Sequence, residues 1–323
     1  MSEAAPRTPE SPGAASKVTE TAKSALRPAA KRIRIATRRA RILPGFIIIG
    51  AQRAGTTSLF YYLRRHPDIR RPSSGDGTVD WPKELHFFDE HYGRGLDWYR
   101  TFFPLAAERR LARMRGRDIV AGEATPYYLF HEAVPGRVAA SVPDVRLIAL
   151  LRDPIERAYS HYQLMHRTGR EKLSFADAIA AEEKRLSKQD LTAEEQVKNA
   201  KGDRAHHHHR HRAYLSRGLY ADQLERWYAH FPREQLLVIR AEDFSSRPTE
   251  IYSEVLRFLG VREWQPTDFI ARNRGTYAPI DPELRVQLEE RLAEPNARLA
   301  ALLGWERTWD RPAAHDSSLH SRR

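Results

Sequence analysis

A short apolar run that ends in a glycine-rich turn, directly before an amphipathic helical pattern, constrains this chain more than any other segment. The run covers residues 46–49 and leads into Gly50, four further residues and then Gly55-Thr56-Thr57. Glycines allow the backbone to fold tightly around an anion, and the start of a helix directs free N–H groups and the positive end of its dipole toward it. The segment therefore predicts a phosphate-binding loop between a buried strand and a helix.

The cation in this loop is not where a nucleotide triphosphatase has it. Those proteins carry Lys directly after the second glycine, whereas this chain has Thr56 there and Arg53 inside the loop. The apolar run 145–151 is followed by Arg152 and not by an Asp that could hold Mg²⁺. A P-loop kinase or nucleotide hydrolase is therefore the second hypothesis. A loop without magnesium ligands suits a 5′-phosphosulfate better than a triphosphate. We therefore predict no metal site.

Strand and helix patterns alternate after residue 44. Short apolar runs flanked by turn residues are typical of strands covered on both faces, as in a parallel sheet. The alternation predicts one α/β domain, a P-loop-like doubly wound parallel sheet flanked by helices. The expected strands are 46–50, 118–122, 145–151 and 236–240, and the expected helices are 56–66, 97–103, 155–167, 218–230, 248–259 and 282–303.

Charge and composition divide the chain into a domain at 44–310 and two tails. Residues 1–43, rich in Ala, Pro, Ser and Thr at their start, are expected to be a disordered basic tail, and residues 311–323 a second disordered tail. Lys31 to Arg41 is interpreted as a solvated linker, with contact to an anionic surface or partner as the alternative. The charged, His-rich segment 181–212 is expected to be a mobile insertion, and its run His206 to His211 a solvated tract and not a metal site.

The net charge of +12 lies mostly on the tails, because residues 1–43 carry +7 and residues 311–323 carry +2. The third hypothesis is a non-catalytic basic nucleic-acid-binding protein. It is disfavoured because residues 44–310 carry a net charge of only +3 and contain no recognisable nucleic-acid-binding motif. No apolar run approaches the ~20 residues of a transmembrane helix. Without cysteines or a visible secretory signal, the expected location is the cytoplasm. The sequence carries no signal of oligomeric state.

Four ordered motifs resemble the sulfotransferase superfamily, within it the heparan-sulfate-type branch and its bacterial relatives. They are Gly50–Ser58 (GAQRAGTTS), Lys83–Asp89 (KELHFFD), Leu150–Ser160 (LLRDPIERAYS) and Arg272–Tyr277 (RNRGTY). The resemblance covers roughly residues 44–310. It implies transfer of a sulfuryl group from 3′-phosphoadenosine 5′-phosphosulfate to a hydroxyl or amine of an acceptor. A carbohydrate is the first expectation; a lipid-linked sugar, a peptide and a secondary metabolite are the alternatives. The chain departs from the branch in carrying Arg53 where Lys is usual, a cation with a different geometry.

The resemblance also assigns roles to single residues. Glu84 is the expected general base because a carboxylate near sulfur can take the acceptor proton. His86, two residues on, would face the same side of an extended segment; it is either a second candidate base, an acceptor-orienting residue or a packed structural His. Arg53 would stabilise the leaving oxygen. Donor binding is expected from Gln52, Arg53, Ala54, Gly55, Thr56, Thr57 and Ser58 at the 5′ end, from Arg152 and Ser160 at the 3′-phosphate, and from Arg274, Gly275 and Tyr277.

Overall fold

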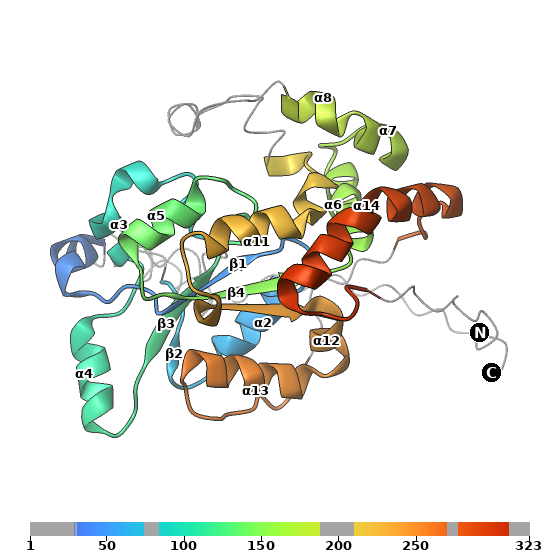
Figure 1. The fold of residues 1–323 in the computed structure, drawn as a ribbon. Coiled ribbons are helices and arrows are strands. Elements are labelled where there is room, and N and C mark those ends of the chain that lie inside the picture. The colour runs from blue at the N-terminus through green and yellow to red at the C-terminus, as the bar shows by residue number, and fades with distance from the viewer. Residues whose placement is uncertain (1–28, 30, 74–83, 188–209, 270–276, 310–323) are drawn as a thin grey trace, which may run out of the picture.

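The computed structural model describes residues 29, 31–73, 84–187, 210–269 and 277–309 (Figure 1). Its centre is a five-stranded sheet in the order β2-β3-β1-β4-β5, and every pair of neighbouring strands is parallel. The strands are β1 (Phe46–Gly50), β2 (Ile69–Arg70), β3 (Val120–Ala124), β4 (Arg146–Leu151) and β5 (Leu236–Arg240). The predicted parallel α/β fold is confirmed.

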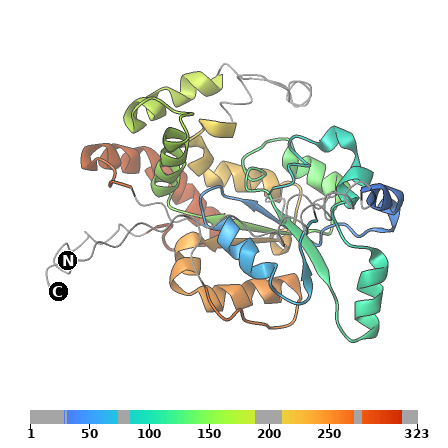
Figure 2. The same cartoon turned by 180° about the vertical axis from the view of Figure 1, so that it is seen from behind.

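Helices cover both faces of the sheet. α2 and α13 lie against one face, and α5 and α11 lie against the other (Figures 1 and 2). The α-helices with their bounds are α2 (Thr56–Leu63), α3 (Leu96–Arg100), α4 (Ala106–Met114), α5 (Val134–Ser141), α6 (Pro154–Arg167), α7 (Phe175–Ala180), α8 (Glu182–Ser187), α11 (Tyr220–Tyr228), α12 (Ala241–Ser246), α13 (Pro248–Leu259) and α14 (Pro282–Leu303). Short 3₁₀ turns are η1 (Arg38–Ala40), η2 (Tyr92–Arg94), η3 (Ser216–Gly218) and η4 (Arg233–Gln235).

The central strand β1 is buried along its whole length, which explains its continuous apolar sequence. Phe46 pairs with Gly122 of β3 and with Arg146 of β4. A Cβ atom at Gly122 would lie 2.2 Å from the Phe46 ring, so only glycine leaves room for this ring between the two strands. The large Phe46 ring and the lack of a side chain at Gly122 are therefore complementary in this part of the sheet.

The chain order reverses beside β1, whose two neighbours are β3 and β4. In open α/β sheets, ligands bind at the carboxyl ends of the strands at such a reversal, because the loops there diverge and leave a crevice. The loops that follow β1, β3 and β4 begin at residues 51, 125 and 152. The described residues of the first three predicted motifs lie in these loops or contact them, and the fold therefore places these three motifs together.

Several elements differ from the sequence prediction. β3 begins two residues later than expected, and the two-residue strand β2 was not predicted. α4, α5, α7, α8 and α12 were not predicted either. α8 occupies residues expected to belong to the mobile insertion; its buried Glu182 accepts hydrogen bonds from the backbone N–H groups of Leu215 (2.8 Å) and Ser216 (2.9 Å). This start of the segment 181–212 is thus anchored, while residues 188–209 lie outside the described part.

The end of the expected N-terminal tail is also ordered. Residues 31–36 are helical, and Ile42 and Leu43 pack against the hydrophobic core. Arg41 is buried, and its guanidinium donates to the carbonyl oxygen of Phe103 at 2.6 Å. The linker interpretation of Lys31 to Arg41 does not describe this stretch, because four of its five arginines have carbonyl or carboxylate partners on the domain. Among the residues that the structure describes, no helix has the length and apolar character needed to cross a bilayer.

Candidate active site

The loop after β1 has the predicted strand–turn–helix geometry. Arg53 and Gly55 both have left-handed backbone conformations, with φ of 73° and 91°. The turn ends at Thr56, the first residue of α2, so the free N–H groups of the helix start point into the loop. The N–H of Ala51 donates to the carbonyl oxygen of Leu150 at 2.7 Å, which ties the loop to β4. This is the geometry that an anion needs; ligand binding by Ala54, Thr57 and the rest of the loop stays a prediction.

The structure brings the two predicted phosphate ends together. Nε of Arg53 donates a hydrogen bond to Oγ of Ser160 at 3.0 Å, and Nη1 of Arg152 lies 3.5 Å from the carbonyl oxygen of Arg53. Ser160 lies on the buried side of α6, directly across from the loop. Burial lowers the pKa of the Arg53 guanidinium; the nearby Tyr277 hydroxyl raises it, and Arg152 and Arg167 lower it further. Several cations, of which Arg53 is partly desolvated, therefore lie near the contact between Arg53 and Ser160.

Two buried arginines that the sequence analysis missed, Arg217 and Arg157, contact Gln52 of the loop. Arg217 donates to the side-chain oxygen of Gln52 at 2.5 Å and to the carbonyl oxygen of Arg210 at 2.6 Å, and burial lowers its pKa to about 9. Arg157 on α6 is fully buried and donates to the carbonyl oxygen of Tyr214. No carboxylate of the described residues forms an ion pair with Arg157. Its place between Ile155 and Ala158 on the apolar side of α6 was the sequence signal that could have revealed it.

The segment with Glu84 is fixed to the end of β3 through a buried carboxylate. The N–H of Leu85 donates to Oγ1 of Thr125 at 3.2 Å, and Thr125 donates to Oε2 of Glu123 at 2.7 Å. Tyr99 donates to the other oxygen of Glu123 at 2.5 Å. Burial raises the pKa of Glu123 to about 7, although these hydrogen bonds oppose the shift. The predicted site segment is thus held at the carboxyl edge of the sheet.

His86 lies between two carboxylates. Its Nδ1 is 2.6 Å from Oδ2 of the fully buried Asp89, and its Nε2 is 3.1 Å from Oε2 of Glu84. His86 has a left-handed backbone, with φ of 49°. The side chains of His86 and Glu84 do face each other, as expected, but a turn and not an extended segment brings them together. Burial alone would lower the pKa of His86; the hydrogen bonds to Asp89 and Glu84 outweigh it and raise the pKa to about 9. Asp89 was within the quoted motif, but no role was predicted for it.

Arg210 closes this group of charges. Its guanidinium lies 2.9 Å from Nε2 of His86 and forms an ion pair with Glu90. The ligand atoms of His86, Asp89 and Glu90 lie within 4.8 Å of one another, as in a metal site. The Arg210 guanidinium places a positive charge beside two of these residues, His86 and Glu90. Through its carbonyl oxygen, Arg210 also connects this group to Arg217 and hence to Gln52 of the loop.

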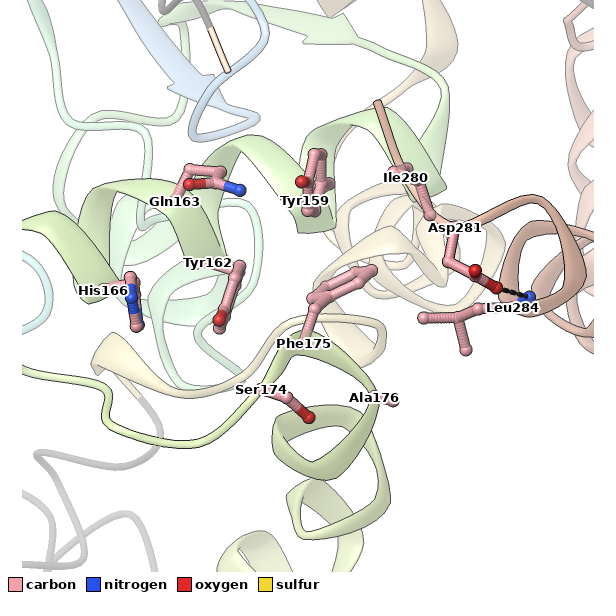
Figure 3. Close-up of a pocket in the computed structure, with 10 residues that line it drawn as sticks. All are labelled: Tyr159, Tyr162, Gln163, His166, Ser174, Phe175, Ala176, Ile280, Asp281 and Leu284. Atoms are coloured by element: carbon pink, nitrogen blue, oxygen red, sulfur yellow. Dashed lines mark hydrogen bonds between the residues drawn. The ribbon is translucent and has the colours of Figure 1, made fainter. Parts of the chain in front are cut away.

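Part of the predicted donor site lies outside the described residues, namely Arg274 and Gly275, as do Lys83 and residues 206–209. Tyr277 is described, and its ring packs edge-on against Tyr159 with 5.3 Å between the centroids. Next to this contact, α6, α7 and the start of α14 enclose a pocket of about 440 Å³ (Figure 3). Rings of Tyr159, Tyr162 and His166 line its α6 side, and Phe175 faces them from α7. Tyr159, which lines this pocket, directly precedes Ser160 of the predicted donor site on α6.

The chain is similar in sequence to known proteins of one family. Residues 43–272 match the family model described as sulfotransferase domain. The human bifunctional heparan sulfate N-deacetylase/N-sulfotransferase 3 is 31% identical over 290 residues, which cover 81% of this chain and 30% of that protein. The membrane-associated sulfotransferase kil1 of Dictyostelium discoideum is 26% identical over 327 residues, covering 83% of this chain and 66% of that protein. The chain thus spans less than two thirds of the length of either relative.

A solved structure agrees as well. The crystal structure of a sulfotransferase from Alicyclobacillus acidocaldarius superposes with a TM-score of 0.59 at 30% identity, covering 82% of this chain and 97% of that one. Family model, relative and solved structure therefore agree on the family, and the solved structure agrees with the fold. The chain belongs to the sulfotransferase family and is an enzyme of sulfuryl transfer.

Proposed function

We propose that this sulfotransferase takes its sulfuryl group from 3′-phosphoadenosine 5′-phosphosulfate and transfers it to a hydroxyl or amine of a carbohydrate. The observation that carries the donor assignment is the 3.0 Å contact between Arg53 of the loop and Ser160 of α6. It brings the two proposed anion-binding elements side by side at the edge of the sheet. A nucleoside with phosphates on both the 3′ and the 5′ oxygens would need two such elements close together.

The charges near the loop favour a ligand with several negative charges. Arg53, Arg152 and Arg157 converge there, and Arg157 is fully buried without a carboxylate partner among the described residues. A buried cation is costly unless an opposite charge compensates it. The donor phosphates would supply that charge, with backbone N–H groups of the loop and Arg53 on the 5′-phosphosulfate and with Arg152 and Ser160 on the 3′-phosphate.

Glu84 is the proposed general base. With its pKa raised to about 9, His86 is already protonated at neutral pH and cannot accept a proton there. Glu84 would take the proton from the acceptor while the acceptor oxygen or nitrogen forms its bond to sulfur. The bond from sulfur to the bridging oxygen breaks in the same displacement, and 3′-phosphoadenosine 5′-phosphate leaves with the electron pair. Arg53 and the loop N–H groups would stabilise that oxygen as its charge develops.

The carbohydrate acceptor rests on the relatives, several of which are named heparan sulfate N-sulfotransferases. Arg210 beside Glu84 and His86 would offer an acceptor a hydrogen-bond donor at the reacting end of the site. No metal is proposed for catalysis, because Arg210 supplies the cation at the group formed by His86, Asp89 and Glu90.

Two variants test the division of this site into a reacting end and a binding end. Glu84→Gln keeps the shape of the side chain but cannot take a proton, so turnover should fall by about 10²-fold or more while donor affinity stays nearly unchanged. Arg152→Ala should instead weaken binding of the desulfated donor roughly 10- to 100-fold, less than for a fully buried charge pair, because Arg152 is 28% exposed.

Affinity is measured by calorimetric titration with 3′-phosphoadenosine 5′-phosphate, and turnover with a panel of oligosaccharides and labelled donor. Glu234→Gln, an exposed carboxylate in η4 directly before β5 and therefore at the opposite, amino edge of the sheet, is the matched control and should change neither quantity. If Glu84→Gln keeps more than half of the wild-type turnover, Glu84 is not the base. If both variants lose donor affinity equally, the proposed division of the site is wrong.

A further inference from the structure

Two helical segments at one end of the molecule expose apolar and basic side chains together. They are residues 31–41 and residues 106–118, which include η1 and α4, and we call them the basic apolar end. Both lie at the same end of the molecule, on the side away from α7 and α14 (Figures 1 and 2). No predicted or observed residue of the donor site belongs to either segment.

The apolar side chains of this end face solvent. Ile33, Ile35, Leu111 and Met114 are 60%, 46%, 48% and 78% exposed, and they are four of the six large apolar side chains that the described part of the chain exposes. Leu111 and Met114 are three residues apart and therefore share one side of α4. No residue of α4 is buried. The helix is amphipathic, yet the protein leaves its apolar side uncovered.

The same end carries a large net positive charge. Residues 31–41 contain six basic and no acidic residues, and residues 106–118 contain five basic and two acidic ones, which gives +9 of the total +12. Arg109 and Arg113 share Asp118 at 2.8 Å. Lys31, Arg32, Arg110 and Arg115 form no ion pair or hydrogen bond through their side chains with the rest of the described structure. They are therefore available to an external anion.

Main-chain and side-chain contacts hold the two segments in one place. Arg41 and Leu105 form an antiparallel bridge, and the N–H of Ile42 donates to the carbonyl oxygen of Pro104 at 3.1 Å. Arg38 pairs with Asp97 of α3 at 3.2 Å. Because the bridge fixes the end of one segment to the start of the other, the two segments hold their exposed apolar and basic groups at one end of the molecule and are not two loose tails.

We propose that the basic apolar end binds the surface of a bilayer that contains anionic phospholipids. Helices that lie on such surfaces combine a basic polar side with an apolar side that enters the boundary of the acyl chains. Basic residues near an anionic leaflet are attracted to it over a distance of about one Debye length. An acidic polysaccharide would account for the arginines, but it offers nothing to Leu111, Met114 or Ile33. Lipid accounts for both kinds of side chain.

Co-sedimentation of the full-length protein with vesicles tests this proposal. The protein should partition onto phosphatidylcholine vesicles that contain phosphatidylglycerol at least tenfold more strongly than onto pure phosphatidylcholine, and high salt should weaken the binding. The double variant Leu111→Glu/Met114→Glu should reduce the partition coefficient at least tenfold. Both side chains face solvent, so the variant should fold normally, which its circular dichroism and melting temperature would show.

The matched control is Leu173→Glu/Val286→Glu, which places the same two charges at the other exposed apolar side chains, 37% and 54% exposed. It should bind vesicles like the wild type. A second pair, Arg110→Glu/Arg115→Glu, should weaken vesicle binding to a similar degree as the α4 apolar variant. The proposal is overturned if both double variants of α4 bind anionic vesicles like the wild type. It is also overturned if the arginine pair matters only for retention on heparin and not for vesicles, which would indicate a polysaccharide surface.

Discussion

The charge of His86 determines which neighbours it can bind. Nε2 lies within hydrogen-bond distance of both Glu84, an acceptor, and Arg210, a donor. Protonated Nε2 can donate to Glu84 but cannot accept from Arg210, whereas an unprotonated Nε2 does the reverse. Asp89 accepts from Nδ1 in either state. His86 therefore links the orientation of Glu84 to its own protonation, and we expect it to position the base.

This linkage predicts a pH-dependent contribution of His86 to stability. The folded state raises the pKa of His86 from 6.5 to about 9. Its stabilising contribution should therefore be fully present below pH 6.5 and should be lost as the pH rises through 9. The difference in unfolding free energy between wild type and His86→Gln should be largest near pH 6, at most about 3 kcal/mol, and should shrink toward pH 9.5. Urea unfolding across this range measures it.

A matched His230→Gln variant separates this effect from the general response of the protein to pH, because His230 is exposed on the surface. Its stability should follow that of the wild type across the whole range. A His86→Gln difference that stays constant, or that grows with rising pH, would show that His86 is not held protonated by Glu84 and Asp89.

At the scale of elements, the docked segment 31–43 contains one buried arginine. Arg41 donates to the carbonyl oxygen of Phe103 at 2.6 Å and to Oγ1 of Thr37 at 3.0 Å. Arg41→Ala leaves a buried carbonyl oxygen without this donor, so the unfolding free energy should fall by about 1–3 kcal/mol. The neighbouring Arg39 has a side chain that is 85% exposed, and Arg39→Ala should cost less than about 0.5 kcal/mol.

Chemical denaturation of the two variants measures the comparison. Equal and negligible losses would mean that the segment contributes nothing to the stability of the domain and is a tail, as the composition alone indicated. A loss confined to Arg41→Ala, together with a smaller slope of unfolding against denaturant, would mean that residues 31–43 detach before the domain unfolds.

The sequence identified those elements whose signal is local. β1, its loop and α2 were predicted almost to the residue because an apolar run, two glycines and a helix start follow one another in the chain. The contacts of Arg41, Arg157 and Arg217 were missed because their partners are 57 to 165 residues away. α4 was missed because its apolar side chains face no core. The role of Asp89 was missed because its hydrogen bond with His86 depends on the left-handed backbone of His86. The sequence analysis expected this segment to be extended.

At the scale of the whole molecule, the reversal of chain order beside β1 assembles the site. β1 contributes Arg53, the end of β3 holds the segment of Glu84 through Thr125 and Glu123, and β4 leads into Arg152 and α6. Three loops from three adjacent strands thus meet at one edge of a rigid sheet. Donor binding should therefore connect elements from the whole length of the domain, and it should stabilise the molecule as a unit.

The last prediction is that 3′-phosphoadenosine 5′-phosphate raises the melting temperature without added metal. A ligand that binds only the folded state stabilises it by about 2.7 kcal/mol at a concentration of 100 times its dissociation constant. For a domain of this size, that corresponds to a shift of roughly 5 °C or more. The shift should be the same with EDTA and with Mg²⁺, because the proposed contacts are arginines, hydroxyls and backbone N–H groups.

Arg152→Ala should reduce the shift in melting temperature, and Glu84→Gln should leave it intact. Adenosine 5′-phosphate, which lacks the 3′-phosphate, should give a smaller shift with the wild type, and Arg152→Ala should abolish most of the difference between the two nucleotides. Stabilisation by ATP with Mg²⁺ but not by the bisphosphate would contradict the proposed donor.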